Sequence, residues 1–454
     1  MHGIIRPHTF SGTFRVPASK SHTIRRLLIA ALGEGVSEIT YPLDSLDARS
    51  CVSVCRALGA HIEEHRAVDG LCPNPADETG EKLVRWTVQG IGPAPHSALR
   101  TPHSPLDVGN SGTTLFLALA VAALGRGPVE FTGDAQIRCR SAAPLLEALS
   151  GLGITVTSAP KGCAPITVQG PWKGGRVSLP CPTSQYLSAL LLAAPLAPGG
   201  TITEIDVPLL NERPYIELTL SYLDAQKIPY EGAADFSYFR IPGGAQYTPM
   251  NGPVPGDFSS TAFPGGAAVI SGGPVTLLGL DPDDPQGDKV VFDMLSQMGA
   301  EVTWVKLPSP AGRTQPEWGL HISRTGPLWG GVFDLNATPD LLPIMAAVAA
   351  YAEGTTALVN VAHARIKETD RIAVMAQELG KLGVLCEERP DGLIIRGGSA
   401  LRGGGVDGHG DHRVVMALAT AALGAAGPVE IGSAEAAAVT YPGFLELLAA
   451  DIHP

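Results

Sequence analysis

The sequence has 454 residues and a formal net charge of −12, with 44% hydrophobic and 17% charged residues. A chain of this length and composition can bury a large core, and we expect it to form two or three domains. The acidic balance argues against a nucleic-acid surface, which needs an excess of basic residues. It leaves room for small anionic ligands, which need only a local positive pocket.

The cysteines and the apolar runs indicate a cytoplasmic protein without a membrane segment. There are seven cysteines, an odd number, and only Cys51 and Cys55 lie one helical turn apart, with no second pair to complete a zinc site. We interpret them as reduced structural thiols. The first residues, MHGIIRPHTF, lack the apolar core of a secretory signal. The longest apolar runs reach about a dozen residues, short of the ~20 that a membrane helix needs.

One pattern occurs six times along the chain: a polar cluster, an Ala/Leu-rich helix, a glycine stop and a short β-branched strand. A second, amphipathic helix usually follows. The first helices are apolar on all faces and are predicted to be buried, whereas the second helices keep a polar stripe and are predicted to lie outside. In chain order the six copies occupy residues 21–41, 110–133, 184–205, 259–279, 340–361 and 411–433.

The spacing of the copies predicts an α/β fold with two globular domains of three units each. The copies start roughly 70 to 90 residues apart, too far for a thin solenoid with repeats of ~20–50 residues. The Pro/Gly-rich stretch TPMNGPVPGDF, residues 248–258, is the predicted boundary. The first copy also carries an extra polar segment, GLCPNPADETGEKLVRW, which we interpret as a loop or a hairpin.

The polar clusters share one location, the start of a buried helix, where free backbone N–H groups and the helix dipole favour anions. Any one cluster could be an ordinary N-cap, but caps alone do not explain basic and hydroxyl side chains at so many equivalent positions. Arginine suits carboxylates and phosphates because its fork bonds two oxygens at once. The sequence therefore predicts a ligand set with several negative charges. The basic residues at these helix starts are Lys20, Arg25 and Arg413. Further basic residues fall just after a strand in copies two and five: Arg138, Arg140, Arg365, Lys367 and Arg371.

Nine motifs resemble those of the enolpyruvyl transferase family, in particular its 5-enolpyruvylshikimate-3-phosphate synthase members. They are VPASKSHTIRR, DVGNSGTT, GDAQIRCR, PTSQYLSALLLAAPLA, RPYIELT, GDFSSTAF, NATPDLLP, RIKETDR and DHRVVMA, and they span nearly the whole chain. The resemblance implies an inside-out α/β barrel with two domains of three pseudo-symmetric units around buried helices. It places residues 1–18 with 256–454 in one domain and 19–255 in the other, with a two-stranded hinge near 17–20 and 255–257.

The resemblance also implies a reaction of the 2.5.1 transferase class. The 5-hydroxyl of shikimate 3-phosphate adds to C2 of phosphoenolpyruvate, C3 is protonated, and the tetrahedral ketal then loses phosphate. This step belongs to the chorismate branch of aromatic amino acid biosynthesis and is the target of glyphosate. The implied partners are the two small anionic substrates alone, with no metal, cofactor, nucleic acid or membrane, and the implied state is a cytoplasmic monomer.

The resemblance assigns roles to residues of this chain by motif. Asp340 is the implied base on the attacking hydroxyl, and Glu368 or Lys20 is the implied proton donor and acceptor at C3. The phosphoenolpyruvate-binding set is Lys20, Gly112, Arg140, Arg371, His412 and Arg413. The set for shikimate 3-phosphate is Ser21, Arg25, Thr183, Ser184, Gln185, Tyr215, Asp340, His363 and Lys367.

Four positions depart from the family pattern. Phe116 stands where the family has an arginine, Val439 where many members have a lysine, and His363 where an asparagine is frequent. Glu212 replaces a serine near the acceptor's phosphate, and a carboxylate there would repel the phosphate unless it is turned away. These departures leave two alternatives open: an enolpyruvyl transferase with another acceptor, and a non-catalytic paralogue that binds a phosphorylated metabolite.

Overall fold

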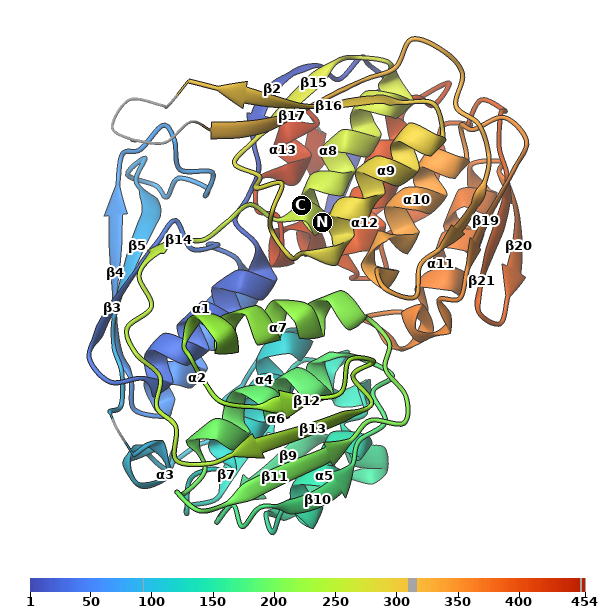
Figure 1. Ribbon diagram of the computed structural model, residues 1–454. Helices are drawn as coiled ribbons and strands as arrows, with labels where there is room; N and C mark the ends of the chain where they lie inside the picture. The colour runs from blue at the N-terminus through green and yellow to red at the C-terminus, as the bar shows by residue number, and fades with distance from the viewer. Residues whose placement is uncertain (93, 309–316, 450, 454) are drawn as a thin grey trace. The chain divides into compact units, whose positions relative to one another are not determined.

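The computed structural model describes residues 1–92, 94–308, 317–449 and 451–453 (Figure 1). The chain divides into two units: unit 1 comprises Met1–Ser19 and Pro255–Pro454, and unit 2 comprises Lys20–Val254. The chain therefore passes between the units twice. On the unit 1 side of these passages the two segments pair, because Ala18 and Gly256 form an antiparallel bridge and Ser19 N donates to Pro255 O at 2.8 Å.

In the described part of unit 2 the strands form three four-stranded sheets, one for each copy of the repeat. The sheet orders are β14-β3-β5-β4, β6-β7-β9-β8 and β10-β11-β13-β12. In each, the first two strands are parallel and the other neighbours antiparallel. The strands are β3 (Val36–Thr40), β4 (His61–Ala67), β5 (Lys82–Gln89), β6 (Leu106–Asp107), β7 (Val129–Thr132), β8 (Thr155–Ala159), β9 (Cys163–Gln169), β10 (Gly175–Ser178), β11 (Ile202–Asp206), β12 (Glu231–Gly232), β13 (Tyr238–Pro242) and β14 (Gly252–Pro253).

Unit 1 repeats the same sheet pattern with strands from both of its chain segments. Its described sheets are β2-β15-β17-β16, β18-β19-β21-β20 and β22-β23-β1-β24, again with a parallel first pair. The strands are β1 (His2–Ile5), β2 (Gly12–Arg15), β15 (Val275–Leu278), β16 (Glu301–Leu307), β17 (Glu317–Ser323), β18 (Val332–Asp334), β19 (Thr355–Val359), β20 (Leu385–Arg389), β21 (Gly392–Arg396), β22 (Gly404–Asp407), β23 (Val429–Gly432) and β24 (Asp451–His453).

The Ala/Leu-rich helices are buried, as predicted. Every residue of α4, α10 and α12 is buried. In unit 1, α8 packs against α10 and α12 (Figure 1). Glycine permits this approach, since a Cβ on Gly266 of α8 would lie 2.6 Å from Ile344 Cδ1 of α10. The six buried helices are α1 (Lys20–Leu32), α4 (Gly112–Ala122), α6 (Gln185–Ala193), α8 (Phe258–Ser271), α10 (Leu342–Ala349) and α12 (His412–Ala422).

The second helices are amphipathic and lie partly exposed. In α11, Ile372, Met375 and Leu379 face the core while Gln377 and Lys381 face solvent, which is the spacing of a one-sided helix. The same class includes α2 (Leu46–Ala57), α5 (Ala143–Gly151), α7 (Arg213–Ala225), α9 (Val290–Gln297) and α11 (Arg371–Lys381), and two short helices are α3 (Pro95–Ala98) and α13 (Phe444–Leu447).

The extra segment of the first copy is a hairpin. Strands β4 and β5 pair in antiparallel fashion, and residues 68–81 connect them. The end of the segment lies in β5, where Trp86 is buried.

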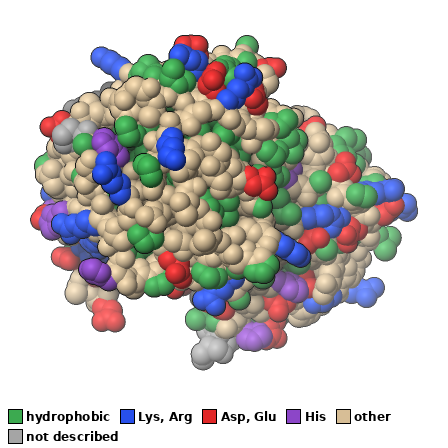
Figure 2. All heavy atoms as spheres, turned by 90° about the horizontal axis from the view of Figure 1, so that it is seen from below, with side chains coloured by type: hydrophobic (Ala, Val, Ile, Leu, Met, Phe, Trp, Pro, Cys, Tyr) green, Lys and Arg blue, Asp and Glu red, His purple; other side chains and the backbone are tan. Residues whose placement is uncertain are grey.

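The charged side chains do not form one large patch on the face in Figure 2, where basic and acidic groups are interspersed. Among the described helices, none combines the length and apolar composition of a membrane-spanning segment.

Candidate active site

Lys20 begins α1 of unit 2 and is held by a buried carboxylate. Its Nζ lies 3.1 Å from Oδ2 of Asp47, and the two side chains are 14% and 5% exposed. Asp47 lies in the first turn of α2, whose N-cap is Ser45. A low-exposure pair of this kind fixes the position of the ammonium group, although its net contribution to stability is small because both charges lose water.

Arg25, one turn further along α1, is a buried cation with no acidic partner among the residues that the structure describes. Its Nε donates to Thr219 Oγ1 at 2.9 Å, its Nη2 to Ser188 Oγ at 3.2 Å, and its Nη1 to the backbone oxygen of Ser21 at 3.2 Å. A fourth, longer contact joins Nη2 to the backbone oxygen of Tyr215 at 3.5 Å. Burial lowers its pKa to about 10, so the guanidinium stays charged at neutral pH. A buried charge held only by neutral groups is a suitable partner for an anionic ligand.

Gly112 and Arg140 lie in direct contact beside the start of α4. A Cβ on Gly112 would lie 2.6 Å from Arg140 Cζ, so glycine is what allows the guanidinium to rest there. Phe116 is buried one turn into α4, and the Arg140 Cζ lies 5.7 Å from its ring centroid, within the range of a cation–π interaction. Tyr186 of α6 packs edge-on against the same ring. Phe116, where the resemblance leads us to expect an arginine, thus supports Arg140.

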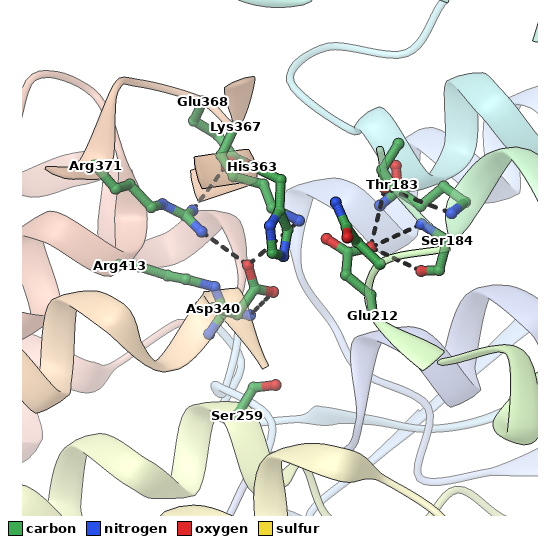
Figure 3. A network of polar contacts seen from close by, with 12 residues as sticks. Thr183, Ser184, Glu212, Ser259, Asp340, His363, Lys367, Glu368, Arg371 and Arg413 are labelled. Atoms are coloured by element: carbon green, nitrogen blue, oxygen red, sulfur yellow. Dashed lines mark hydrogen bonds and ion pairs between the residues drawn. The ribbon is translucent and has the colours of Figure 1, made fainter. Parts of the chain in front are cut away.

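Glu212 is turned into the start of α6, not away from it. Its Oε2 accepts hydrogen bonds from Thr183 Oγ1 at 3.0 Å, from Ser184 N at 2.9 Å and from Ser184 Oγ at 2.7 Å (Figure 3). Gln185, the first residue of α6, donates from Nε2 to Thr113 Oγ1 at 3.0 Å. The carboxylate therefore occupies the donors that the sequence assigned to the acceptor substrate.

In unit 1, Asp340 lies among three cations (Figure 3). It belongs to the short 3₁₀ helix Pro339–Leu341 that leads into α10. Its Oδ1 accepts from Arg371 Nη1 at 2.8 Å, and its Oδ2 lies 2.9 Å from Arg413 Nη2. Lys367 Nζ is 3.9 Å from Oδ1. Cations this close favour the ionised carboxylate.

Arg371 connects Asp340 to two further acids. Its side chain is 1% exposed, and Nη2 donates to Glu368 Oε2 at 2.7 Å. Asp411 accepts from Nε at 2.8 Å and also caps α12 by accepting from Arg413 N at 2.9 Å. Burial lowers the pKa of Arg371, but Asp411, Glu368 and Asp340 together raise it above its ordinary value. Arg371 therefore stays charged, and its ion pairs connect α11 to the start of α12 and to the 3₁₀ helix of Asp340.

Two histidines from the predicted set lie in the same unit. His363 is buried, with Nε2 3.1 Å from the backbone oxygen of Asn336, and His412 is the buried first residue of α12.

A further buried acid stands close to Asp340. Asp288 is 1% exposed and accepts a hydrogen bond from Ser259 Oγ. Burial first, and Asp340 second, raise its pKa to about 6, against the opposing effect of Arg413. Asp340 thus shares its surroundings with a second carboxyl group that titrates near neutrality.

A protein family described as EPSP synthase (3-phosphoshikimate 1-carboxyvinyltransferase) matches residues 5–448 of the chain. The chain belongs to the EPSP synthase family. A relative named 3-phosphoshikimate 1-carboxyvinyltransferase from Acetivibrio thermocellus is 46% identical over 445 residues, which cover 98% of this chain and 96% of the relative. A relative of the same name from Halobacterium salinarum is 40% identical over 458 residues, covering 99% and 98%.

Solved structures agree with this assignment. The EPSP synthase from Acinetobacter baumannii superposes with a TM-score of 0.77 at 30% identity, covering 99% of this chain and 97% of that one. The enolpyruvyl transferase NikO from Streptomyces tendae has the same fold, with a TM-score of 0.74 at 20% identity, covering 100% and 98%. The predicted family and the predicted fold class are confirmed.

Within this EPSP synthase framework the predicted site residues fall into two sets. One set lies on unit 2, at the starts of α1, α4, α6 and α7, and the other lies on unit 1, around Asp340. Val439, where the resemblance leads us to expect a lysine, ends the 3₁₀ helix Ala434–Val439 and supplies no charge there. The roles of the individual residues stay predictions.

Two buried carboxylates beside the predicted site residues are not marked by any motif in the sequence. Asp47 follows an N-capping serine and looks like an ordinary acid in a first helical turn. Asp288 ends the acidic stretch DPDDPQGD, which has the composition of a solvated loop. Only its burial distinguishes it. In the described part of the chain, no three His, Cys, Asp or Glu side chains are arranged to hold a metal ion.

Proposed function

We infer that the chain transfers the enolpyruvyl group of phosphoenolpyruvate to the 5-hydroxyl of shikimate 3-phosphate and releases inorganic phosphate. Relatives over nearly the full length in bacteria and archaea are named 3-phosphoshikimate 1-carboxyvinyltransferase. The reaction is an addition followed by an elimination, and it needs a base for the hydroxyl, a proton for C3 and cations for two anionic substrates. This chain carries residues of each kind.

The observation that supports the mechanism best is the Asp340 carboxylate between Arg371 and Arg413, at 2.8 and 2.9 Å. These cations keep Asp340 ionised, and an ionised carboxylate is able to accept a proton. We assign it the role of base on the 5-hydroxyl. Its low exposure, 19%, limits competition from water.

Cations of both units form the proposed phosphoenolpyruvate-binding set. Lys20 is positioned by Asp47, and Arg140 by Gly112 and Phe116. Positioned cations stabilise the charge that develops on a departing phosphate, which is where electrostatic catalysis has its largest effect. The complete proposed set is Lys20, Gly112, Arg140, Arg371, His412 and Arg413.

The proposed acceptor site centres on the buried Arg25 and on the start of α6. Arg25 has neutral partners only among the described residues, so an anionic group of the acceptor would supply its missing counter-charge. The start of α6 offers hydroxyl and backbone donors suited to a phosphate. The complete proposed set is Ser21, Arg25, Thr183, Ser184, Gln185, Tyr215, Asp340, His363 and Lys367.

Two groups are candidates for the proton at C3. Glu368 is paired with Arg371 and Lys20 with Asp47. Glu368→Gln and Lys20→Met distinguish them, since the variant that lacks the proton carrier should lose exchange of solvent deuterium into C3.

The crossings between the units provide a proposed hinge. Residues 17–20 and 255–257 lie side by side, because Asp257 N donates to Pro17 O at 2.9 Å in addition to the Ala18–Gly256 bridge. We propose that these two segments bend when the units move during turnover, as short strands of this kind do in other closing enzymes.

We further propose a cytoplasmic monomer that acts on its two small substrates alone. All seven cysteines are free thiols, which suits a reducing compartment. Gel filtration at micromolar concentration tests the oligomeric state.

Phosphate release from phosphoenolpyruvate tests the function directly. The purified protein should release phosphate with shikimate 3-phosphate but not with shikimate or without an acceptor. Asp340→Ala should abolish release while both substrates still bind. Release that requires a different acceptor would overturn the assignment, and an active Asp340→Ala variant would remove Asp340 as the base.

A further inference from the structure

Glu212 has an unusual conformation for a glutamate. It is the N-cap residue of α7, with a left-handed backbone (φ 58°, ψ 40°), and it is 2% exposed. Few non-glycine residues adopt this conformation, because it costs about 1 kcal/mol or more, and it persists where surrounding contacts hold it. The contacts here include three hydrogen bonds that Oε2 accepts from Thr183 and Ser184.

The described hydrogen bonds of the buried cation Arg25 do not include Glu212. Arg25 of α1 donates to Ser188, which lies one turn beyond Ser184 on α6. The described contacts of Arg25 are all with neutral groups. Glu212 instead receives a backbone N–H and two hydroxyls at a helix start, the donors that an anionic oxygen prefers. The Glu212 carboxylate therefore takes the place at the start of α6 that an anionic ligand would take.

We propose that Glu212 sets the affinity for the phosphorylated acceptor, because its carboxylate occupies the donors that the acceptor's phosphate uses. The inference rests on the proposed function, which assigns Thr183 and Ser184 to shikimate 3-phosphate. Two anionic oxygens cannot share the same three donors, so the phosphate binds only when the carboxylate leaves. Each binding event therefore includes the cost of breaking the three bonds to Oε2.

The test is the dissociation constant for shikimate 3-phosphate in Glu212→Ser and Glu212→Gln, measured by isothermal titration calorimetry. Removing the competing charge should tighten binding about tenfold or more, given the strength of charge-assisted hydrogen bonds. The Gln variant keeps the shape of the side chain, so it serves if the Ser variant does not fold. Binding of unphosphorylated shikimate should not improve, since no phosphate competes in that case.

Glu217→Gln is the matched control. This glutamate lies on the same helix, is 46% exposed and pairs with Arg213, so its loss of charge should leave the dissociation constant unchanged. A merely structural role for Glu212 predicts the opposite of our expectation, namely weaker binding in both variants. If the wild type turns over shikimate 3-phosphate and the folded variants bind it no more tightly than the wild type does, the inference is overturned and the proposed function stands. Absence of turnover with shikimate 3-phosphate in the wild type and both variants would overturn the proposed function itself.

Discussion

At the residue scale, Gly112 shows how a missing side chain positions a charged one. The space where its Cβ would lie is taken by the guanidinium of Arg140, which rests against the ring of Phe116. The resemblance placed Gly112 in the phosphoenolpyruvate-binding set. The structure adds that the nearest group to this glycine is a protein cation, so its effect on the substrate passes through Arg140.

Gly112→Ala is therefore expected to weaken phosphoenolpyruvate binding by moving Arg140. The added methyl group would lie 2.6 Å from Arg140 Cζ, and the arginine must shift because the helix backbone cannot. We expect KM for phosphoenolpyruvate to rise about tenfold, because a displaced charged hydrogen-bond donor costs about 1.5–3 kcal/mol. Steady-state kinetics measure this KM.

The control for this variant is Gly380→Ala in α11, where an added Cβ meets nothing within 4 Å. It should leave the kinetic constants unchanged and raise stability slightly, because alanine is the better helix former. An unchanged KM in Gly112→Ala would show that Arg140 does not bind phosphoenolpyruvate.

Asp288 makes stability depend on pH. Burial and Asp340 raise its pKa from 3.8 to about 6, so the folded state binds this proton more tightly than the unfolded state. The resulting stabilisation is complete below about pH 4 and is lost as pH rises through 6. The amide side chain of the variant Asp288→Asn is neutral at all pH values. Between pH 4 and 7 the free energy of unfolding should therefore fall more in the wild type than in the variant, and the difference should be on the order of 2–3 kcal/mol.

Urea denaturation of the wild type and of Asp288→Asn across this pH range measures the two free energies of unfolding. The other titrating groups are the same in both proteins, so their contributions cancel in the difference. Asp340, Arg413 and Asp257 surround the same carboxyl group. Parallel curves would mean that Asp288 is already ionised at pH 4.

At the scale of elements, the capping of α11 fixes the start of the helix that carries Arg371. Asp370 is its N-cap, with Oδ1 accepting from Ala373 N at 3.0 Å. Asp370→Ala should cost about 1 kcal/mol of stability and should lower kcat, because the first turn then frays around Arg371. Asp370→Asn keeps an oxygen for the cap and should retain most of both.

Guanidinium denaturation and initial rates measure the two effects. Full stability in Asp370→Ala would mean that the bonds of Arg371 to Asp340, Glu368 and Asp411 hold the helix start without the cap.

The helices could be predicted from the sequence, but the pairing of strands could not. Runs of Ala and Leu bounded by glycine specify a buried helix through local composition alone. Strand β14, in contrast, pairs with β3, which lies far earlier in the chain. Strand β1 pairs with β23, near the other end of the chain. A short alternating segment predicts a strand but does not specify its partner.

The cations of the site could be predicted from the sequence, but the positions of two of its carboxylates could not. The basic residues could be predicted because the repeated pattern places them at helix starts or just after a strand. The inward turn of Glu212 and the burial of Asp288 depend on backbone conformation and on distant neighbours, which a linear pattern does not contain.

At the scale of the whole molecule, the sheets respect the division into units. No described sheet takes strands from both units, and the core of unit 1 forms one cluster of its own residues. Unit 2 is a continuous insertion into unit 1, and the residues that flank it are adjacent, with Ser19 N 2.8 Å from Pro255 O. Inserted segments whose flanks lie close together tend to be independent folding units.

The fragment Lys20–Val254 is therefore expected to fold by itself. It retains three complete sheets and the buried helices α1, α4 and α6, so it should show a single cooperative thermal transition by circular dichroism. It should release no phosphate from phosphoenolpyruvate, because Asp340 is absent. A shorter fragment that ends at Pro242 loses β14 and the buried Tyr247, and it should melt at a lower temperature because β3 then becomes an open edge. A non-cooperative transition in the longer fragment would show that unit 2 needs unit 1 in order to fold.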